Sequence, residues 1–185
     1  MEKKDLKPAG VFKYFEEICQ VPRPSKKEEK IIAYLKAFGV KHNLETNVDE
    51  AGNVLIKKPA TPGKENLQTV ILQSHIDMVC EKNNDVQHDF LTDPIETEID
   101  GEWLKAKGTT LGADNGIGVA TELAILADDN IEHGPLECLF TVDEETGLTG
   151  AFELKEGFMS GDILLNLDSE DEGEIFIGCA GGIDS

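Results

Sequence analysis

A histidine and an aspartate two residues apart occur at residues 74–77, Ser-His-Ile-Asp. In an extended segment, residues two apart project to the same side. Asp77 can therefore accept a hydrogen bond from one nitrogen of His75 and leave the other nitrogen free for a metal ion. The alternative is a histidine satisfied in the core beside a capping aspartate, and the pattern taken alone favours that alternative.

A glycine-rich loop at residues 108–116 contains Asp114 and precedes a predicted helix. Glycines permit tight backbone turns. An aspartate at the junction of loop and helix is typical of a helix N-cap, which is the simplest interpretation of Asp114. A phosphate-binding loop is disfavoured because the Gly-Lys-Ser/Thr ending is missing and an aspartate repels phosphate.

Adjacent carboxylates, Glu144 and Glu145, follow another apolar run. On a regular strand they would point to opposite faces, so both reach one site only if the backbone bends, and Gly147 is placed to help. One carboxylate could then bind a metal while the other moves protons. Taken alone, the motif is more typical of a solvated acidic turn.

A further carboxylate, Asp168, comes directly after the apolar run 163–167, whereas residues 169–174 lack the spacing of a calcium loop and are typical of a solvated turn. Together the motifs give one imidazole and several carboxylates, a ligand set that suits zinc and similar divalent ions. The carboxylates exceed what one ion needs, which suggests two ions sharing a bridging carboxylate.

Helices and strands must alternate to position these residues. Apolar spacing predicts a helix near 8–19 and another that begins with a capping box at Ser25 and Glu28 and ends at Gly39. Further helices are expected over 117–127 and near 147–154. Strands are expected over 53–57, 69–72, 99–106, 136–142, 163–167 and 174–178.

This alternation predicts an α/β fold, a layered α/β/α arrangement around a mixed, largely parallel sheet. The runs 69–72 and 163–167 are typical of strands buried on both faces. Because ligands bind outside the carboxyl ends of strands in such sheets, the polar clusters that follow three of the strands are expected to form one site.

The amino-acid composition limits the kinds of partner that the protein is expected to bind. The chain has 185 residues, the size of one domain, with 39% hydrophobic and 29% charged residues, a globular balance. Its net charge of −20 repels phosphate backbones and anionic membranes, so neither nucleic acid nor a membrane is an expected partner. No signal peptide or membrane span is apparent. Widely spaced thiols predict reduced cysteines in a cytoplasmic protein: Cys19, Cys80, Cys138 and Cys179.

Several motifs resemble the metal-binding motifs of aminoacyl-histidine dipeptidases, a family of two-zinc metallopeptidases that includes the cytosol non-specific dipeptidases. They are SHIDMVCEKN at 74–83, GTTLGADNGIGVA at 108–120 and DEETGLTG at 143–150, with NLDS at 166–169 and GCAGG at 178–182. The resemblance covers nearly the whole chain in the same order. The thirteen residues 108–120 are its most specific part.

The resemblance implies hydrolysis of dipeptides, including Xaa-His dipeptides, with two divalent ions, Zn²⁺ first and Co²⁺ or Mn²⁺ as alternatives. It also implies a cis peptide bond between Asp114 and Asn115. It gives each candidate a role: one ion bound by His75 and Asp168, the other by Glu145, both bridged by Asp114, proton transfer by Glu144, and orientation of His75 by Asp77.

The resemblance is incomplete, because family members are much longer. Their second ion takes a late histidine, and an inserted lid domain carries the dimer contacts. His42, His88 and His133 match no such motif. Residues 1–185 are thus expected to be the N-terminal portion of the catalytic domain, inactive alone, of a homodimeric parent. Two alternatives stay open: a non-catalytic metal-binding or interaction module, and an amidohydrolase acting on N-acyl amino acids.

Overall fold

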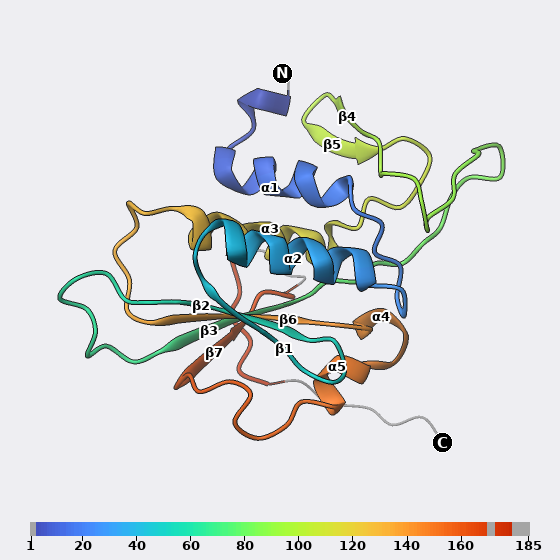
Figure 1. The fold of residues 1–185 in the computed structure, drawn as a ribbon. Helices are drawn as coiled ribbons and strands as arrows, with labels where there is room; N and C mark the ends of the chain where they lie inside the picture. Colours follow the sequence, from blue (N-terminus) through green and yellow to red (C-terminus); the bar gives the residue numbers. More distant parts are fainter. Residues whose placement is uncertain (1–2, 170–172, 179–185) are drawn as a thin grey trace.

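A five-stranded sheet in the order β1-β2-β6-β3-β7 organises the chain (Figure 1). The computed structural model describes residues 3–169 and 173–178. The strands are β1 (Glu45–Val48), β2 (Val54–Lys58), β3 (Val70–His75), β6 (Leu136–Thr141) and β7 (Ile163–Asn166). The mixed α/β sheet is confirmed: β2 pairs antiparallel with β1 and β6, whereas β3 pairs parallel with β6 and β7. The parallel strands are those that lead into the predicted site.

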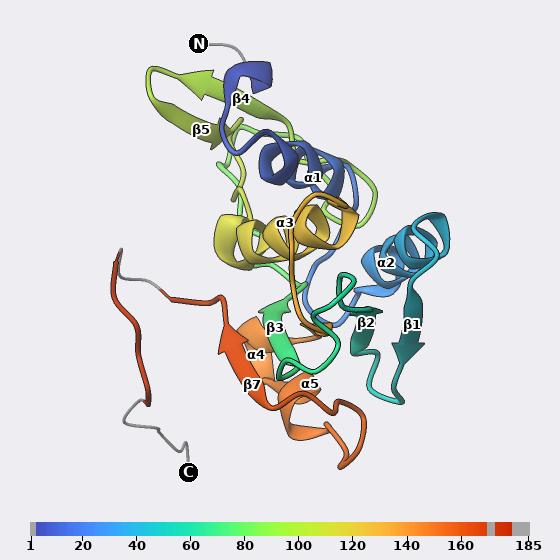
Figure 2. The same ribbon diagram turned by 90° about the vertical axis from the view of Figure 1, so that its left-hand side faces the viewer.

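Two of three helices lie on one face of this sheet, and the first packs against the third on the side away from the sheet, as Figures 1 and 2 show. The three helices are α1 (Ala9–Cys19), which follows the short 3₁₀ helix η1 (Lys3–Asp5), α2 (Glu29–Lys41) and α3 (Ala113–Ala127). Alternate residues of the central strands pack against them, including Ile56, Leu72 and Phe140. This period of two is expected for strands with one face on a helical layer. None of the described helices is long and apolar enough to span a membrane.

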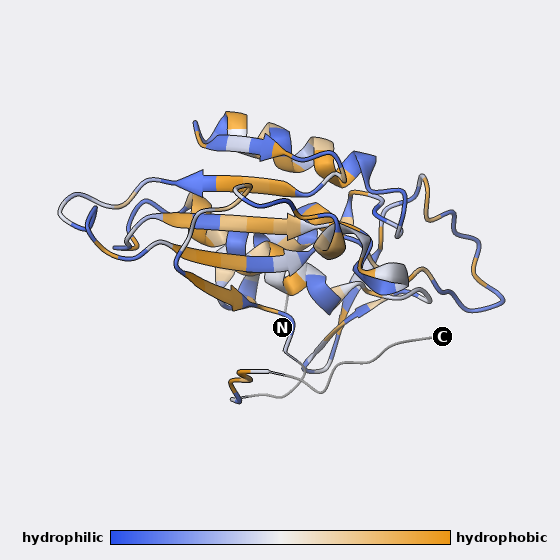
Figure 3. Cartoon of the chain, turned by 90° about the horizontal axis from the view of Figure 1, so that it is seen from below, coloured by the Kyte–Doolittle hydropathy of each residue, from blue (hydrophilic) through white to orange (hydrophobic). Residues whose placement is uncertain are grey.

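The opposite face of the sheet, seen from below in Figure 3, has a thinner cover. Leu55, Ile71 and Leu139 are buried there under side chains of the segment 154–159. This segment follows two four-residue helices, α4 (Glu144–Gly147) and α5 (Thr149–Phe152). Within the described ranges, the expected second helical layer therefore consists of these short helices and an irregular segment.

The expected capping box of α2 is wrong. Ser25 Oγ donates instead to Asp77 Oδ2 at 2.7 Å, and Glu28 Oε1 accepts the backbone N–H of Asp143 at 3.0 Å. Both side chains therefore form hydrogen bonds with residues that follow β3 and β6, rather than capping their own helix. Gly39 does not end α2 either. It lies inside the helix, where a Cβ would clash with Thr46 Oγ1, so it permits the close approach of β1.

Other boundaries also differ from expectation. Residues 99–106 form part of a hairpin, β4 (Thr97–Asp100) and β5 (Trp103–Ala106), turned at Gly101 with φ +63°. No strand forms over 174–178, and β1 has no counterpart among the expected strands. Cys179 and most of the 178–182 motif lie outside the described residues; the other three cysteines are free thiols.

The strand β7 lies at the edge of the sheet, and it is exposed rather than buried. Ile163, Leu164 and Leu165 keep 40%, 48% and 47% of their surface. Among the described residues, no strand pairs with the outer side of β7. An apolar run of this kind predicts a buried strand only when both neighbours are present.

Candidate metal centre

His75 is the last residue of β3, and its side chain is 1% exposed. Its Nδ1 lies 3.2 Å from Asp77 Oδ1, as the spacing in the sequence predicted. Asp77 is fully buried and also accepts hydrogen bonds from Ser25 Oγ at 2.7 Å, Glu144 N at 3.0 Å and Glu145 N at 3.2 Å. These contacts fix the imidazole so that Nε2 faces away from Asp77.

Opposite pKa shifts accompany this pair. Burial raises the pKa of Asp77, but the hydrogen bonds from His75, Ser25 and the backbone outweigh it and bring the pKa down to about 2. Burial lowers the pKa of His75, but Asp77, Asp114 and Asp168 outweigh it and raise the pKa to about 9. The imidazole nitrogens thus lie between carboxylates, and at Nε2 a cation could take the place of the proton.

Two aspartates from different elements face this nitrogen. Asp114 Oδ1 lies 3.0 Å from His75 Nε2, and Asp168 Oδ2 lies 3.9 Å from it. Asn115 Nδ2 donates to Asp168 Oδ1 at 2.5 Å and so joins the start of α3 to the end of β7. The three candidate ligands His75, Asp114 and Asp168 have ligand atoms within 4.8 Å of one another.

Asp114 is not a helix cap. The N-cap position of α3 is Gly112, with φ +66°, and no side chain makes a cap hydrogen bond there. Asp114 itself has φ −83° and ψ 115°, so regular helix begins only after Asn115. The Asp114–Asn115 peptide bond is cis, as the resemblance implied. The extended backbone leaves the carboxylate 70% exposed and directed at His75.

Glu144 and Glu145 reach the same place because the chain bends directly after β6. Asp143 adopts a left-handed conformation with φ 50°, and α4 begins at the next residue. Its carboxylate accepts the hydroxyl groups of Thr146 and Thr149, which fixes the turn. Glu144, Glu145 and His75 then form a second group with ligand atoms within 4.8 Å. The predicted bend is confirmed, with Asp143 as its centre.

The electrostatics of the cluster favour a cation. Burial raises the carboxyl pKa values of Glu144, Glu145 and Asp168; His75 opposes this, and neighbouring carboxylates add to it. A divalent ion would relieve this repulsion. An imidazole nitrogen with several carboxylate oxygens is also a donor set that zinc and similar ions accept. The residues present therefore fit a metal centre.

A third acidic group, formed by Glu28, Asp77 and Asp143, is buried beside this centre. Its oxygens accept hydrogen bonds from backbone N–H groups and hydroxyls, including Lys26 N to Glu28 at 2.9 Å. It is thus a hydrogen-bonded network that supports the bend. Sequence reasoning missed this use of Glu28, because the same residue fits a local capping pattern.

Arg23 was also missed. Its side chain is 3% exposed and donates to the carbonyl oxygens of Ile76 at 3.1 Å, Asp77 at 3.0 Å and Gly112 at 2.5 Å. The only sequence signal is a cation between two prolines, Pro22 and Pro24. A separate cavity of about 490 Å³ opens between α1 and the far end of α3, and no candidate site residue lines it.

The remaining histidines do not join the cluster. The ring of His42 lies 4.4 Å from that of Phe38, and His88 lies 4.4 Å from Phe90. His133 Nδ1 lies 2.7 Å from the carbonyl oxygen of Gly134. Each is half-buried rather than fully on the surface, and each has a local partner.

A cluster of this kind at the carboxyl ends of parallel strands is typical of metal-dependent hydrolases, and the sequence comparison gives a family of peptide hydrolases. Residues 71–179 match peptidase family M20/M25/M40. The chain therefore belongs to this family.

Several known proteins resemble this chain in sequence or in structure. The cytosol non-specific dipeptidase of Escherichia coli (strain K12) is 54% identical over 183 residues, which is 99% of this chain and 38% of that protein. The crystal structure of aminoacylhistidine dipeptidase from Vibrio alginolyticus superposes with a TM-score of 0.94 at 55% identity, over 97% of this chain and 36% of that one. Aminopeptidase PepT from Bacillus cereus gives 0.74 at 27% identity, over 88% and 43%. The chain thus spans about two fifths of the length of these relatives.

Proposed function

We propose that the protein to which this chain belongs hydrolyses dipeptides with two divalent cations held by this cluster. The observation that carries the proposal is the convergence of His75 with carboxylates at the ends of β3, β6 and β7 and at the start of α3. The names of the relatives from E. coli and V. alginolyticus support dipeptides, including Xaa-His dipeptides, as the substrate class. The E. coli name also supports a cytoplasmic location.

Each residue has a proposed role. His75 and Asp168 would hold one ion, Glu145 the other, and Asp114 both. Bound ions, Zn²⁺ or alternatively Co²⁺ or Mn²⁺, would polarise the scissile carbonyl and make a water acidic. Asp77 keeps the imidazole oriented through its hydrogen bond to Nδ1.

Glu144 is the proposed general base. Its carboxylate is 34% exposed, and Oε2 lies 3.8 Å from His75 Nε2, so it borders the cluster and still reaches the solvent side. Burial raises the pKa of Glu144, with nearby carboxylates adding to this effect. A raised pKa suits a group that accepts a proton from water and returns it to the leaving amine.

The chain covers less than half of the length of its relatives, so the protein to which it belongs is expected to be longer. We propose that residues 1–185 are the N-terminal portion of the catalytic domain. The additional length of the relatives would then contain a further ligand for the second ion and the lid through which the protein forms a homodimer. By itself, this portion is expected to hold the first ion more tightly than the second, because fewer of its residues reach the second.

The test uses the full-length protein, purified with its metal. Glu144→Gln should retain the metal, and its turnover of an Xaa-His dipeptide should fall about 10²–10⁴-fold, because the amide cannot accept a proton. His75→Ala should lose the metal as well. Near-normal turnover by Glu144→Gln with normal metal content would contradict the assignment of the base.

The same assay separates the alternatives. Hydrolysis of N-acyl amino acids in preference to dipeptides would favour an amidohydrolase. Metal binding without any peptide or amide hydrolysis would favour a non-catalytic module. Turnover unaffected by removing all divalent metal with a chelator would contradict the metal mechanism.

A further inference from the structure

The guanidinium of Arg23 lies between the two segments that carry His75 and Asp114. On one side, Nη1 donates to the carbonyl oxygens of Ile76 and Asp77, which directly follow His75. On the other side, Nη2 donates to the carbonyl oxygen of Gly112, two residues before Asp114. One planar group thus joins the end of β3 to the turn that begins α3.

The surrounding backbone is shaped to admit this group. A Cβ at Gly112 would lie 2.5 Å from Arg23 Nη2, and a Cβ at Gly116 would lie 2.7 Å from it. Arg23 is fixed from behind as well, because Met78 N donates to its carbonyl oxygen at 3.2 Å and Pro24 forms a bridge with Met78. Gly112 and Gly116 therefore leave room for the arginine side chain, besides shaping the turn itself.

Burying an arginine whose partners are carbonyl oxygens carries a desolvation penalty, which packing alone does not explain. Charged groups in protein interiors are usually paired with opposite charge, whereas the hydrogen bonds of the Arg23 side chain within the described ranges go to neutral carbonyl oxygens. The rigid fork of a guanidinium can bridge acceptors on two segments at fixed separation, which a single ammonium group does less well. This geometry suits a side chain that fixes the separation between two backbone segments.

We propose that Arg23 is a positioning residue of the metal centre, which holds His75 and Asp114 at the separation a shared cation requires. This inference rests on the proposed metal-dependent function. Among the described residues, the side-chain hydrogen bonds of Arg23 go to backbone carbonyl oxygens, so it acts through the backbone of residues 76–77 and 112.

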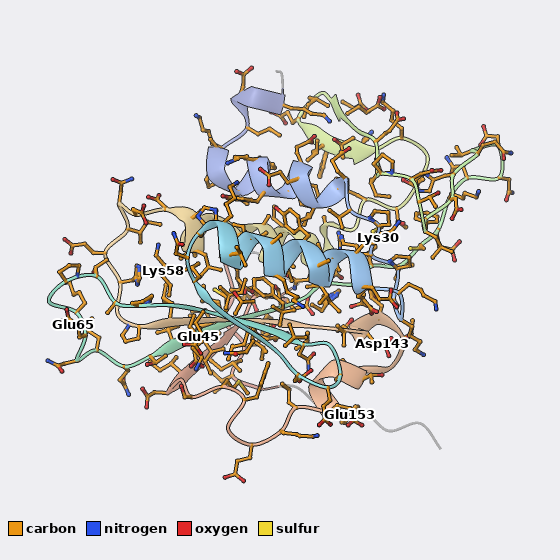
Figure 4. The ribbon with its side chains drawn as sticks, viewed as in Figure 1. Lys30, Glu45, Lys58, Glu65, Asp143 and Glu153 are labelled. Carbon is orange, nitrogen blue, oxygen red and sulfur yellow. The ribbon has the colours of Figure 1, made fainter. Side chains whose placement is uncertain are left out.

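A matched control exists at the other end of α3. Lys58 is a buried cation on β2, and its Nζ donates to the carbonyl oxygens of Ile125 at 3.0 Å and Asp128 at 2.7 Å. Like Arg23, it donates to backbone carbonyl oxygens, in this case at the C-terminal end of α3. Figure 4 shows Lys58 at the opposite end of the sheet from Asp143, which precedes α4.

The experiment titrates the 185-residue chain and its variants with Co²⁺ and records the visible absorption, which reports the number and geometry of ligands. Arg23→Gln should raise the Co²⁺ dissociation constant about 10–100-fold, the usual effect of losing a group that supports ligands, and should alter the spectrum. Arg23→Lys should recover part of the affinity. Lys58→Gln should lower the melting temperature yet leave the Co²⁺ dissociation constant within about twofold of the unchanged chain, because it is far from the ligands.

The outcomes separate the two proposals. If Arg23→Gln does not fold, Arg23→Lys decides, because it keeps the charge and loses the fork. Co²⁺ binding and spectra of the folded Arg23 variants that equal those of the unchanged chain would overturn the positioning role. So would an equal loss of affinity in Lys58→Gln, because it would reduce the effect to general destabilisation. Failure of the unchanged chain to bind Co²⁺ would overturn the metal centre and, with it, this role.

Discussion

Two fully buried carboxyl groups, Asp77 and Glu122, contact neighbouring residues at the end of β3. Asp77 accepts hydrogen bonds from His75, Ser25 and two backbone N–H groups. Glu122, on α3, accepts one from Ser74 Oγ at 2.7 Å, and its Oε2 has no hydrogen-bond partner of ordinary length among the described residues. The two sites are equally buried but differ in their supply of donors.

Their charge differs accordingly. The pKa of Asp77 falls to about 2 because its hydrogen bonds outweigh the effect of burial. Burial raises the pKa of Glu122 well above its usual value, because Ser74 and the weakly donating thiol of Cys138 do not compensate. Donors rather than depth therefore decide whether a buried carboxyl group is charged. Asp77, with the lowered pKa, supports the metal centre, and Glu122, with the raised pKa, lies in the core beneath it.

Removing the charged group should have the largest effect. Asp77→Ala leaves a buried histidine, a hydroxyl and two N–H groups without their acceptor. We expect the free energy of unfolding to fall by about 3–5 kcal/mol, the usual cost of deleting one partner of a buried charged network. Urea unfolding of the 185-residue chain measures it. A loss below about 1 kcal/mol would mean that water replaces the carboxylate and that the network is not cooperative.

The raised pKa of Glu122 should make the stability of the protein depend on pH. The folded pKa of Glu122 is raised above its usual 4.5, so the folded state holds a proton that the unfolded state releases. Its contribution to stability is complete below about pH 4.5 and is lost as pH rises toward the folded pKa, by up to about 1.4 kcal/mol for each pH unit. Glu122→Gln does not titrate and should remove this slope. Unfolding curves at several pH values from about 5 to 8 test it, and parallel pH dependence of both proteins would show that Glu122 is already ionised.

A smaller effect is expected from the donor itself. Ser74→Ala removes the ordinary hydrogen bond to Glu122 and should lower the free energy of unfolding by about 1–2 kcal/mol, with a further rise in the pKa of Glu122. Thr121→Ala is the control, because its hydroxyl bonds the carbonyl oxygen of Ile117 on the exposed side of α3. Equal losses in the two variants would indicate that Ser74 matters only as a local packing residue.

The candidate ligands at strand ends could be predicted from the sequence, whereas the residues that hydrogen-bond to the segments carrying them could not. His75, Glu144 and Asp168 each follow an apolar run, a signal contained in a few neighbouring positions. Arg23 has no such signal, since its acceptors lie 53, 54 and 89 residues away. Ser25 carries a misleading one: its spacing from Glu28 fits a helix cap, yet it bonds a residue 52 positions distant.

Sheet position is similarly hard to predict. The composition of 163–167 does not distinguish a central strand from an edge strand, because both can be continuous apolar runs. The β4–β5 hairpin resembles a single strand in the sequence, because Gly101 alone marks the turn within it. In both cases the missing information is the identity of the neighbouring strand, which is a long-range property.

The exposed edge strand β7 has a consequence for handling the chain in solution. Its outer backbone groups and its half-exposed Ile163, Leu164 and Leu165 form a template on which a second molecule could add a strand. A net charge of −20 keeps molecules apart at low ionic strength, but the range of that repulsion shrinks to about 8 Å in roughly 0.15 M salt. Colloidal stability should thus decline as salt is added, so dilute buffer of low ionic strength is the condition in which the chain should stay dispersed longest.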